Sequence, residues 1–200
     1  MLPLLLASAS PRRRELLERV GVLLEVRPAD IDEDPRAGEP PLAYVARIAH
    51  DKALAVARHP GQWVLAADTT VTIDGAILGK AATGDEAAAM LRQLSGRVHQ
   101  VITAFTIVGD AGEATFHHDG LVSTDVSMIG LDDAAIADYV ASGEWRGKAG
   151  AYAIQGIAAA FVREVHGSVT NVIGLPLVEV LEALRAVGAP SARLAAGIPS

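Results

Sequence analysis

The side chains best suited to chemistry are cations at positions where a positive charge is unfavourable. Three consecutive arginines, Arg12 to Arg14, directly follow Ser10-Pro11, a pair typical of a helix start. In the first helical turn they would meet the partial positive charge of the helix dipole, which disfavours cations. A bound phosphate would remove this conflict, because backbone N–H groups and guanidinium groups would then point at the same anion. The alternative is three solvated arginines on an exposed turn.

A lysine falls on the apolar stripe of a second expected helix, over residues 41–59. Lys52 shares this stripe with Leu42, Val45 and Val56 at helical spacing. Its ammonium group must therefore reach solvent at the helix edge or pair with an anion. Solvent exposure is the commoner fate of a single lysine, and a nearby anion is the functional alternative.

An aspartate interrupts a segment that otherwise suits a buried strand, Val64 to Ile73. A carboxylate there is costly unless it is paired, hydrogen-bonded or bound to a metal, so Asp68 is the leading catalytic candidate. The structural alternative is an aspartate that accepts local backbone N–H groups where the strand bends. A phospho-aspartyl nucleophile is not favoured, because the second acid expected two residues later is replaced by Thr70.

Two further groups could hold a metal ion. Asp32 to Asp34 form an acidic run whose oxygens suit a hard divalent cation, although such a run is more often a solvated loop. His117-His118 resembles a metal pair only superficially, because neighbouring side chains on a strand point to opposite faces. We therefore assign no metal to the two histidines.

Composition restricts the class of protein. The chain has 200 residues, half of them hydrophobic, which suits one compact domain or two lobes sharing a sheet. The net charge of -7 should repel nucleic acid and anionic membranes, so an anion needs a local basic pocket. The absence of cysteine excludes disulfides and thiol nucleophiles and favours the cytoplasm. The apolar run Leu2–Leu6 is too short for a signal peptide or a membrane span.

The elements that must position these residues alternate between strands and helices. Adjacent hairpins break a strict βαβ pattern, so we expect an α/β fold with a mixed sheet. We expect one domain over residues 1–187 and a flexible tail over 188–200. The expected strands lie near residues 4–6, 64–73, 76–78, 98–108, 114–128 and 161–165, and the expected helices near 11–20, 41–59, 83–95, 132–142 and 177–187.

Together these segments resemble the Maf family of nucleotide pyrophosphatases from Leu4 to Leu184. LLLASASPRRRELLERVG, starting at Leu4, is similar to the family's Ser-x-Ser-Pro-Arg-Arg motif, and AADTTVTIDGAILGK, starting at Ala66, to its Ala-Asp-Thr motif. LSGRVHQVIT, KAGAYAIQG and NVIGLPL resemble the remaining blocks. The order and spacing of these motifs make the resemblance specific.

The resemblance implies two α/β lobes around a long twisted mixed sheet, with an active-site groove between them, as in Maf and ITPase-like folds. It implies hydrolysis of a nucleoside triphosphate to the monophosphate and pyrophosphate, with a divalent cation, Mg²⁺ or alternatively Mn²⁺ or Co²⁺. It also implies a homodimer. The residues that it assigns are Asp68 as catalytic carboxylate and metal ligand, Glu33 as metal ligand, and Ser8, Arg12, Arg13, Lys52 and Lys80 as phosphate-binding residues.

Substrate choice within the family is implied by three positions. Arg12, Thr69 and Gln155 resemble the branch that acts on dTTP, UTP and modified pyrimidine nucleotides, whereas the 7-methyl-GTP branch has a bulky aromatic at the first position. A glutamine amide both donates and accepts, as a thymine or uracil edge requires. The alternatives are a pyrophosphatase for 7-methyl-GTP or another purine nucleotide, and a nucleotide-sensing regulator of cell division without turnover.

Overall fold

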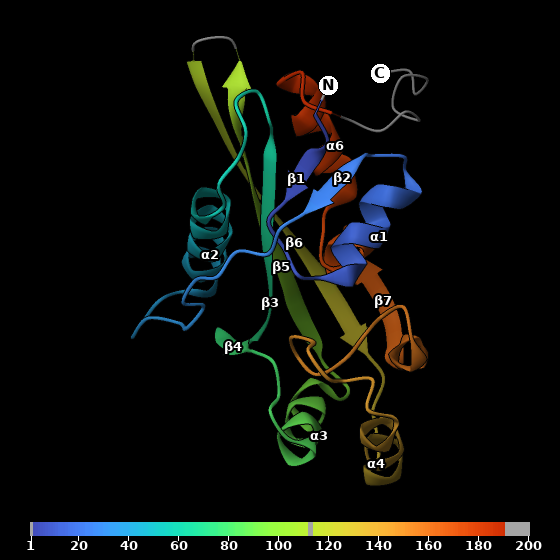
Figure 1. The fold of residues 1–200 in the computed structure, drawn as a ribbon. Helices are drawn as coiled ribbons and strands as arrows, with labels where there is room; N and C mark the ends of the chain where they lie inside the picture. The colour runs from blue at the N-terminus through green and yellow to red at the C-terminus, as the bar shows by residue number, and fades with distance from the viewer. Residues whose placement is uncertain (1, 112–113, 191–200) are drawn as a thin grey trace.

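A computed structural model describes residues 2–111 and 114–190, and Figure 1 shows their arrangement. The last ten residues of the expected tail, 191–200, lie outside the described residues. In chain order the elements are β1 (Leu4–Leu6), α1 (Pro11–Arg19), β2 (Leu24–Val26), α2 (Pro41–Ala55), β3 (Val64–Ile73), β4 (Ala76–Leu78), α3 (Gly84–Leu94), β5 (Val98–Ala111), β6 (Ala114–Met128), α4 (Asp133–Ser142), a 3-10 helix η1 (Ile157–Phe161), β7 (Val162–His166), α5 (Val169–Ile173) and α6 (Leu177–Ala186).

The strands form one mixed sheet, as the interrupted βαβ pattern predicts. Seven strands take the order β2-β1-β3-β5-β6-β7, and β4 pairs with β3 beside this path. β1 is parallel to β2 and β3, whereas the pairs β3–β5, β5–β6 and β6–β7 are antiparallel. The β5 and β6 strands, 14 and 15 residues long, run through the length of the molecule and join its two ends (Figure 1).

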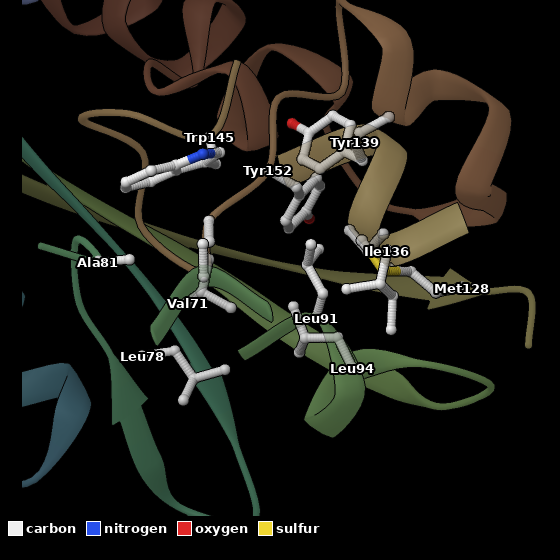
Figure 2. Packing of buried hydrophobic residues seen from close by; sticks show 14 of the residues in the cluster. Val71, Leu78, Ala81, Leu91, Leu94, Met128, Ile136, Tyr139, Trp145 and Tyr152 are labelled. Carbon is white, nitrogen blue, oxygen red and sulfur yellow. The ribbon is translucent and has the colours of Figure 1, made fainter. Parts of the chain in front are cut away.

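Two hydrophobic cores divide the fold into the expected two lobes. In one lobe α1 and α6 cover one face of the sheet, where Leu17 and Leu184 pack with Phe105, and α2 covers the opposite face (Figure 1). In the other lobe, α3 and α4 bury Leu91 and Ile136 in a second cluster that includes Trp145 and Tyr152 (Figure 2). No helix within residues 2–111 and 114–190 is long and apolar enough to cross a membrane.

Local sequence signals explain most of the element ends. Asp74 and Gly75 take φ values of 53° and 79°, the left-handed pair that a tight β3–β4 turn requires. Thr83 caps α3 by accepting a hydrogen bond from the backbone N–H of Glu86 at 3.2 Å. Ser10 precedes α1 as predicted, but its side chain makes no capping bond to the helix. The backbone N–H groups at the start of α1 are therefore not capped by the Ser10 side chain.

Replacing Gly109 by alanine should destabilise the fold. A Cβ atom at Gly109 would lie 2.2 Å from the Trp63 ring, so the indole or the strand would have to move. We expect a loss of about 1–3 kcal/mol in the free energy of unfolding, as is usual for an overpacked core. Urea denaturation measures this change. Gly130→Ala is the matched control, since a Cβ there meets nothing within 4 Å, and equal losses in both variants would contradict the packing argument.

Candidate active site

The candidate site lies at a gap along one edge of β3. β1 pairs with β3 at Val64 and Leu65, and β4 pairs with it at Val71–Ile73. Asp68 and Thr69 lie between these two pairings, next to the carboxyl end of β1, where the chain turns into α1. Because successive residues of a strand face opposite sides, Asp68 points to the α2 side of the sheet and Thr69 to the α1 side. At this gap both side chains reach the same pocket.

Arg13 is hydrogen-bonded to three separate segments on the α1 side of the pocket. Its guanidinium group donates to Ser8 Oγ at 2.9 Å, to Thr69 Oγ1 at 3.0 Å and to the carbonyl of Gly174 at 2.8 Å. The side chain is buried, and burial lowers the pKa of Arg13 while the nearby Asp68 carboxylate opposes the shift. An arginine stays charged even so. Arg13 thus places a fixed positive charge in the wall of the pocket.

The other two arginines of the first turn point in different directions. Arg12 is half-buried in the pocket and donates to the carbonyl of Ile173 at 3.3 Å. Arg14 is exposed and pairs with Glu18 one turn later, at 2.7 Å. The solvated alternative is therefore correct for Arg14, whereas the first two arginines converge on the pocket.

Lys52 lies on the α2 side, between two carboxylates. Its ammonium group is 2.9 Å from Asp68 Oδ1 and 2.8 Å from Glu33 Oε1. Lys52 and Asp68 are both only 7% exposed, so the solvent-exposed alternative is wrong for Lys52. Partial burial would raise the pKa of Glu33, but Lys52 and Lys80 outweigh that effect, and the net pKa shift is downward. Glu33 therefore remains an anion at the edge of the pocket.

Asp68 sits in an unbroken ladder, not at a strand bend. It pairs with Ala104 of β5, and the register continues on both sides without a shift. Its carboxylate contacts Lys52 instead of local backbone N–H groups. The structural alternative is thus wrong, and the cost of burying Asp68 is offset by a cation from α2.

The second lobe contributes further cations from the segment after β4 and from the loop after α4. Lys80, largely exposed, lies 3.8 Å from Glu33 and forms an isolated bridge with Ala149. Lys148, next to Ala149, also lines the pocket. Partial burial lowers the pKa of Lys148, and the positive charge of Arg12 lowers it further. Sequence reasoning missed Lys148, although the KAGAYAIQG segment begins with it. The pocket therefore has cations on both lobes.

All nine residues expected at the site line this one pocket. They are Ser8, Arg12, Arg13, Glu33, Lys52, Asp68, Thr69, Lys80 and Gln155.

The three positions associated with substrate choice differ in whether the side chain is already hydrogen-bonded within the protein or is available to a ligand. The Thr69 hydroxyl is part of an internal network, with Arg13 at 3.0 Å and Thr103 Oγ1 at 2.9 Å. Gln155 is exposed and lines the same pocket. Arg12 and Gln155 are therefore better placed than Thr69 to contact a ligand directly.

Tyr152 lines the pocket and contacts a buried histidine, His99, that was not among the expected site residues. Its hydroxyl lies 2.8 Å from His99 Nε2, and both side chains are at most 5% exposed. Burial lowers the pKa of His99 to about 4, with a weaker opposing effect from Asp125. His99 is therefore neutral at pH 7 and acts as a hydrogen-bond partner of Tyr152.

This histidine makes stability depend on pH. Below about pH 6.5 the unfolded chain protonates His99 while the folded chain does not, so the free energy of unfolding should fall as the pH drops toward 4. The contribution is at most roughly 1.4 kcal/mol per pH unit. Urea denaturation between pH 7.5 and 5 measures it. His99→Gln should show a shallower fall than the unmodified chain, and identical slopes would contradict the neutral buried histidine.

Fold and site together define a two-lobed α/β protein whose groove places cations from both lobes around paired carboxylates, an arrangement suited to a polyphosphate and a divalent cation. Residues 3–187 match the family described as Maf-like protein, and this chain belongs to that family.

Curated relatives cover nearly the whole chain. A dTTP/UTP pyrophosphatase of Anaeromyxobacter dehalogenans (strain 2CP-1 / ATCC BAA-258) is 53% identical over 187 residues, which are 94% of this chain and 95% of the relative. Proteins of the same name from Cereibacter sphaeroides and Myxococcus xanthus are each 50% identical, and the matches cover 96% and 94% of this chain and 99% and 93% of the relatives. The Staphylococcus aureus Ham1 protein superimposes with a TM-score of 0.43 at 16% identity, over 66% of this chain and 76% of that chain.

Proposed function

We propose that this chain hydrolyses nucleoside triphosphates, dTTP and UTP foremost, to the nucleoside monophosphate and pyrophosphate. The observation that carries the proposal is the buried Lys52 between Asp68 and Glu33, in a pocket walled by further cations from both lobes. A triphosphate needs several cations and a carboxylate site for its metal ion, and this pocket offers both. Relatives about half identical over nearly their whole length carry the name of this activity.

Asp68 and Glu33 fit a hard divalent cation. Both carboxylates already converge on one positive charge, the ammonium group of Lys52, at 2.9 and 2.8 Å. Family membership is consistent with dependence on a divalent metal ion, and we propose Mg²⁺, with Mn²⁺ or Co²⁺ as substitutes. When bound, the ion neutralises triphosphate charge and polarises a phosphoryl oxygen. Within the described residues, no histidine lines this pocket.

The protein's own side chains then hold and orient the triphosphate. Arg12, Lys80 and Lys148 all line the pocket and can bind phosphate oxygens. Water attacks the α-phosphorus, a new oxygen–phosphorus bond forms, and the bond to the β-phosphate oxygen breaks. Asp68 takes the proton of that water, since it is the buried carboxylate among the residues that line the pocket. The same cations neutralise and orient the leaving pyrophosphate.

Base selection falls to the exposed end of the pocket. Gln155 can donate to and accept from a thymine or uracil edge, and Arg12 lines the same pocket. Thr69 acts indirectly, because its hydroxyl fixes Arg13. We also propose a cytoplasmic homodimer without nucleic-acid or membrane partners, which agrees with the acidic net charge of -7.

A triphosphate panel tests this function. With Mg²⁺, dTTP and UTP should each yield the monophosphate and pyrophosphate in a one-to-one ratio. Chelation of the metal should stop the reaction. The panel should include dCTP, dATP, dGTP and 7-methyl-GTP. A strong preference for 7-methyl-GTP or a purine nucleotide would overturn the base assignment, and binding without any pyrophosphate release would favour a nucleotide-sensing regulator instead.

A further inference from the structure

A second cluster of metal-ligating side chains lies outside the catalytic pocket. His50 of α2 and His117 and Asp119 of β6 bring their ligand atoms within 4.8 Å of one another. The two imidazole rings lie 4.9 Å apart, and His117 Nε2 is 3.0 Å from Asp119 Oδ1. His117 and Asp119 are two residues apart on one strand and so share its α2 face. His118 points to the other face, toward Phe105.

This cluster is distinct from the carboxylate pair at Asp68. Asp119 pairs across the sheet with Thr106 of β5, which in turn pairs with Ala66 of β3. The cluster is therefore two strands away from β3, a separation on the order of 10 Å. In the described part of the chain β7 pairs with β6 only from Asp125 onward, so Asp119 lies on an open sheet edge.

The geometry favours a transition-metal ion over Mg²⁺. Two imidazoles and one carboxylate suit Zn²⁺ and its neighbours, whereas Mg²⁺ prefers oxygen ligands. The Asp119 carboxylate is already oriented, because Thr106 Oγ1 donates to its Oδ1 at 2.5 Å, the supporting bond common at metal ligands.

We propose that His50, His117 and Asp119 bind a Zn²⁺-type divalent ion that links α2 to the outer strand β6, with a fourth position open to water. A shallow pocket between α2 and the sheet has His50 and Asp119 on its wall, which gives such an ion access from solvent. His50 lies two residues before Lys52 on the same helix. The ion therefore fixes the helix that carries the buried catalytic-site lysine, and its role is structural.

Calorimetric titration of the full chain with Zn²⁺, in excess Mg²⁺, tests the proposal. We expect one tight site, and His117→Ala or His50→Ala should each weaken it by more than about tenfold, as loss of a ligand requires. Co²⁺ added in place of Zn²⁺ should give the visible absorption of a four-coordinate ion in the unmodified chain and lose it in both variants. Zn²⁺ should also raise the melting temperature of the unmodified chain but not of these two variants.

His118→Ala and Asp68→Asn are the matched controls. The first removes the adjacent histidine on the opposite face, and the second removes the catalytic-site ligand, so both should keep tight Zn²⁺ binding. Absence of a tight site in the unmodified chain, or unchanged binding in His117→Ala and His50→Ala, would overturn the proposal. Loss of binding in Asp68→Asn alone would assign the ion to the catalytic pocket and would equally overturn it.

Discussion

Asp68→Asn should lower kcat for dTTP hydrolysis by about 10²–10⁴-fold, the range expected when a general base is removed. Asparagine keeps the shape of the side chain, so the β3–β5 ladder at Ala104 should remain intact. It cannot take a proton from water, and it is a poorer ligand than a carboxylate for a divalent cation. Lys52 retains Glu33 as a partner at 2.8 Å, which limits the loss of stability.

Steady-state pyrophosphate release and nucleotide binding, measured separately, distinguish catalysis from binding. The variant should bind dTTP with little change while its turnover collapses. Asp125→Asn is the control, since this aspartate of β6 is hydrogen-bonded to Gln100 on the outer surface and is not among the residues that line the active-site pocket. Turnover near the normal value in Asp68→Asn would remove Asp68 from the mechanism.

Arg13→Lys should reduce both stability and activity, although it conserves charge. The guanidinium group holds Ser8, Thr69 and the Gly174 carbonyl at once, through a planar fork that an ammonium group cannot reproduce. Loss of these buried charged hydrogen bonds should lower the free energy of unfolding by about 2–4 kcal/mol. KM for dTTP should rise, because the turn after β1 and the segment at Gly174 would no longer frame the pocket.

Arg14→Lys is the matched control on the adjacent residue. Arg14 is exposed and pairs only with Glu18 within its own helix, an interaction worth a few tenths of a kcal/mol. Urea denaturation and kinetics of both variants make the comparison. If Arg13→Lys were as mild as Arg14→Lys, the three-way network would not be what organises this side of the site.

The long elements were predictable because their signals are repeated along the chain. The β5 and β6 strands alternate over more than ten residues each, and Asp74-Gly75 marks the β3–β4 turn directly. β2 and α5, with three and five residues, are too short to show any periodicity, and both were missed. The second helix was predicted to end near residue 59, but α2 ends at Ala55. The residues after Ala55 are compatible with a helix, so the predicted end was too late.

At the site, local sequence identified charges in unfavourable positions but could not identify their partners. Lys52 stood out on an apolar stripe, yet its ion pair with Asp68 depends on how α2 crosses β3. Thr69 looked like a ligand contact, and only the tertiary structure shows it bonded to Arg13. His117 was set aside because its neighbour faces away, and its actual companion, His50, comes from a helix 67 residues earlier in the chain. Such pairings are set by long-range packing.

The central claim is that one groove binds the triphosphate between cations of both lobes, opposite the Asp68 carboxylate. A crystal structure of Asp68→Asn with dTTP and Mg²⁺ tests it most directly. The phosphates should lie within hydrogen-bonding distance of Arg12, Lys52 and Lys80, with the α-phosphate beside position 68 and the thymine near Gln155. A nucleotide bound elsewhere, or bound with its phosphates directed away from these cations, would contradict the account.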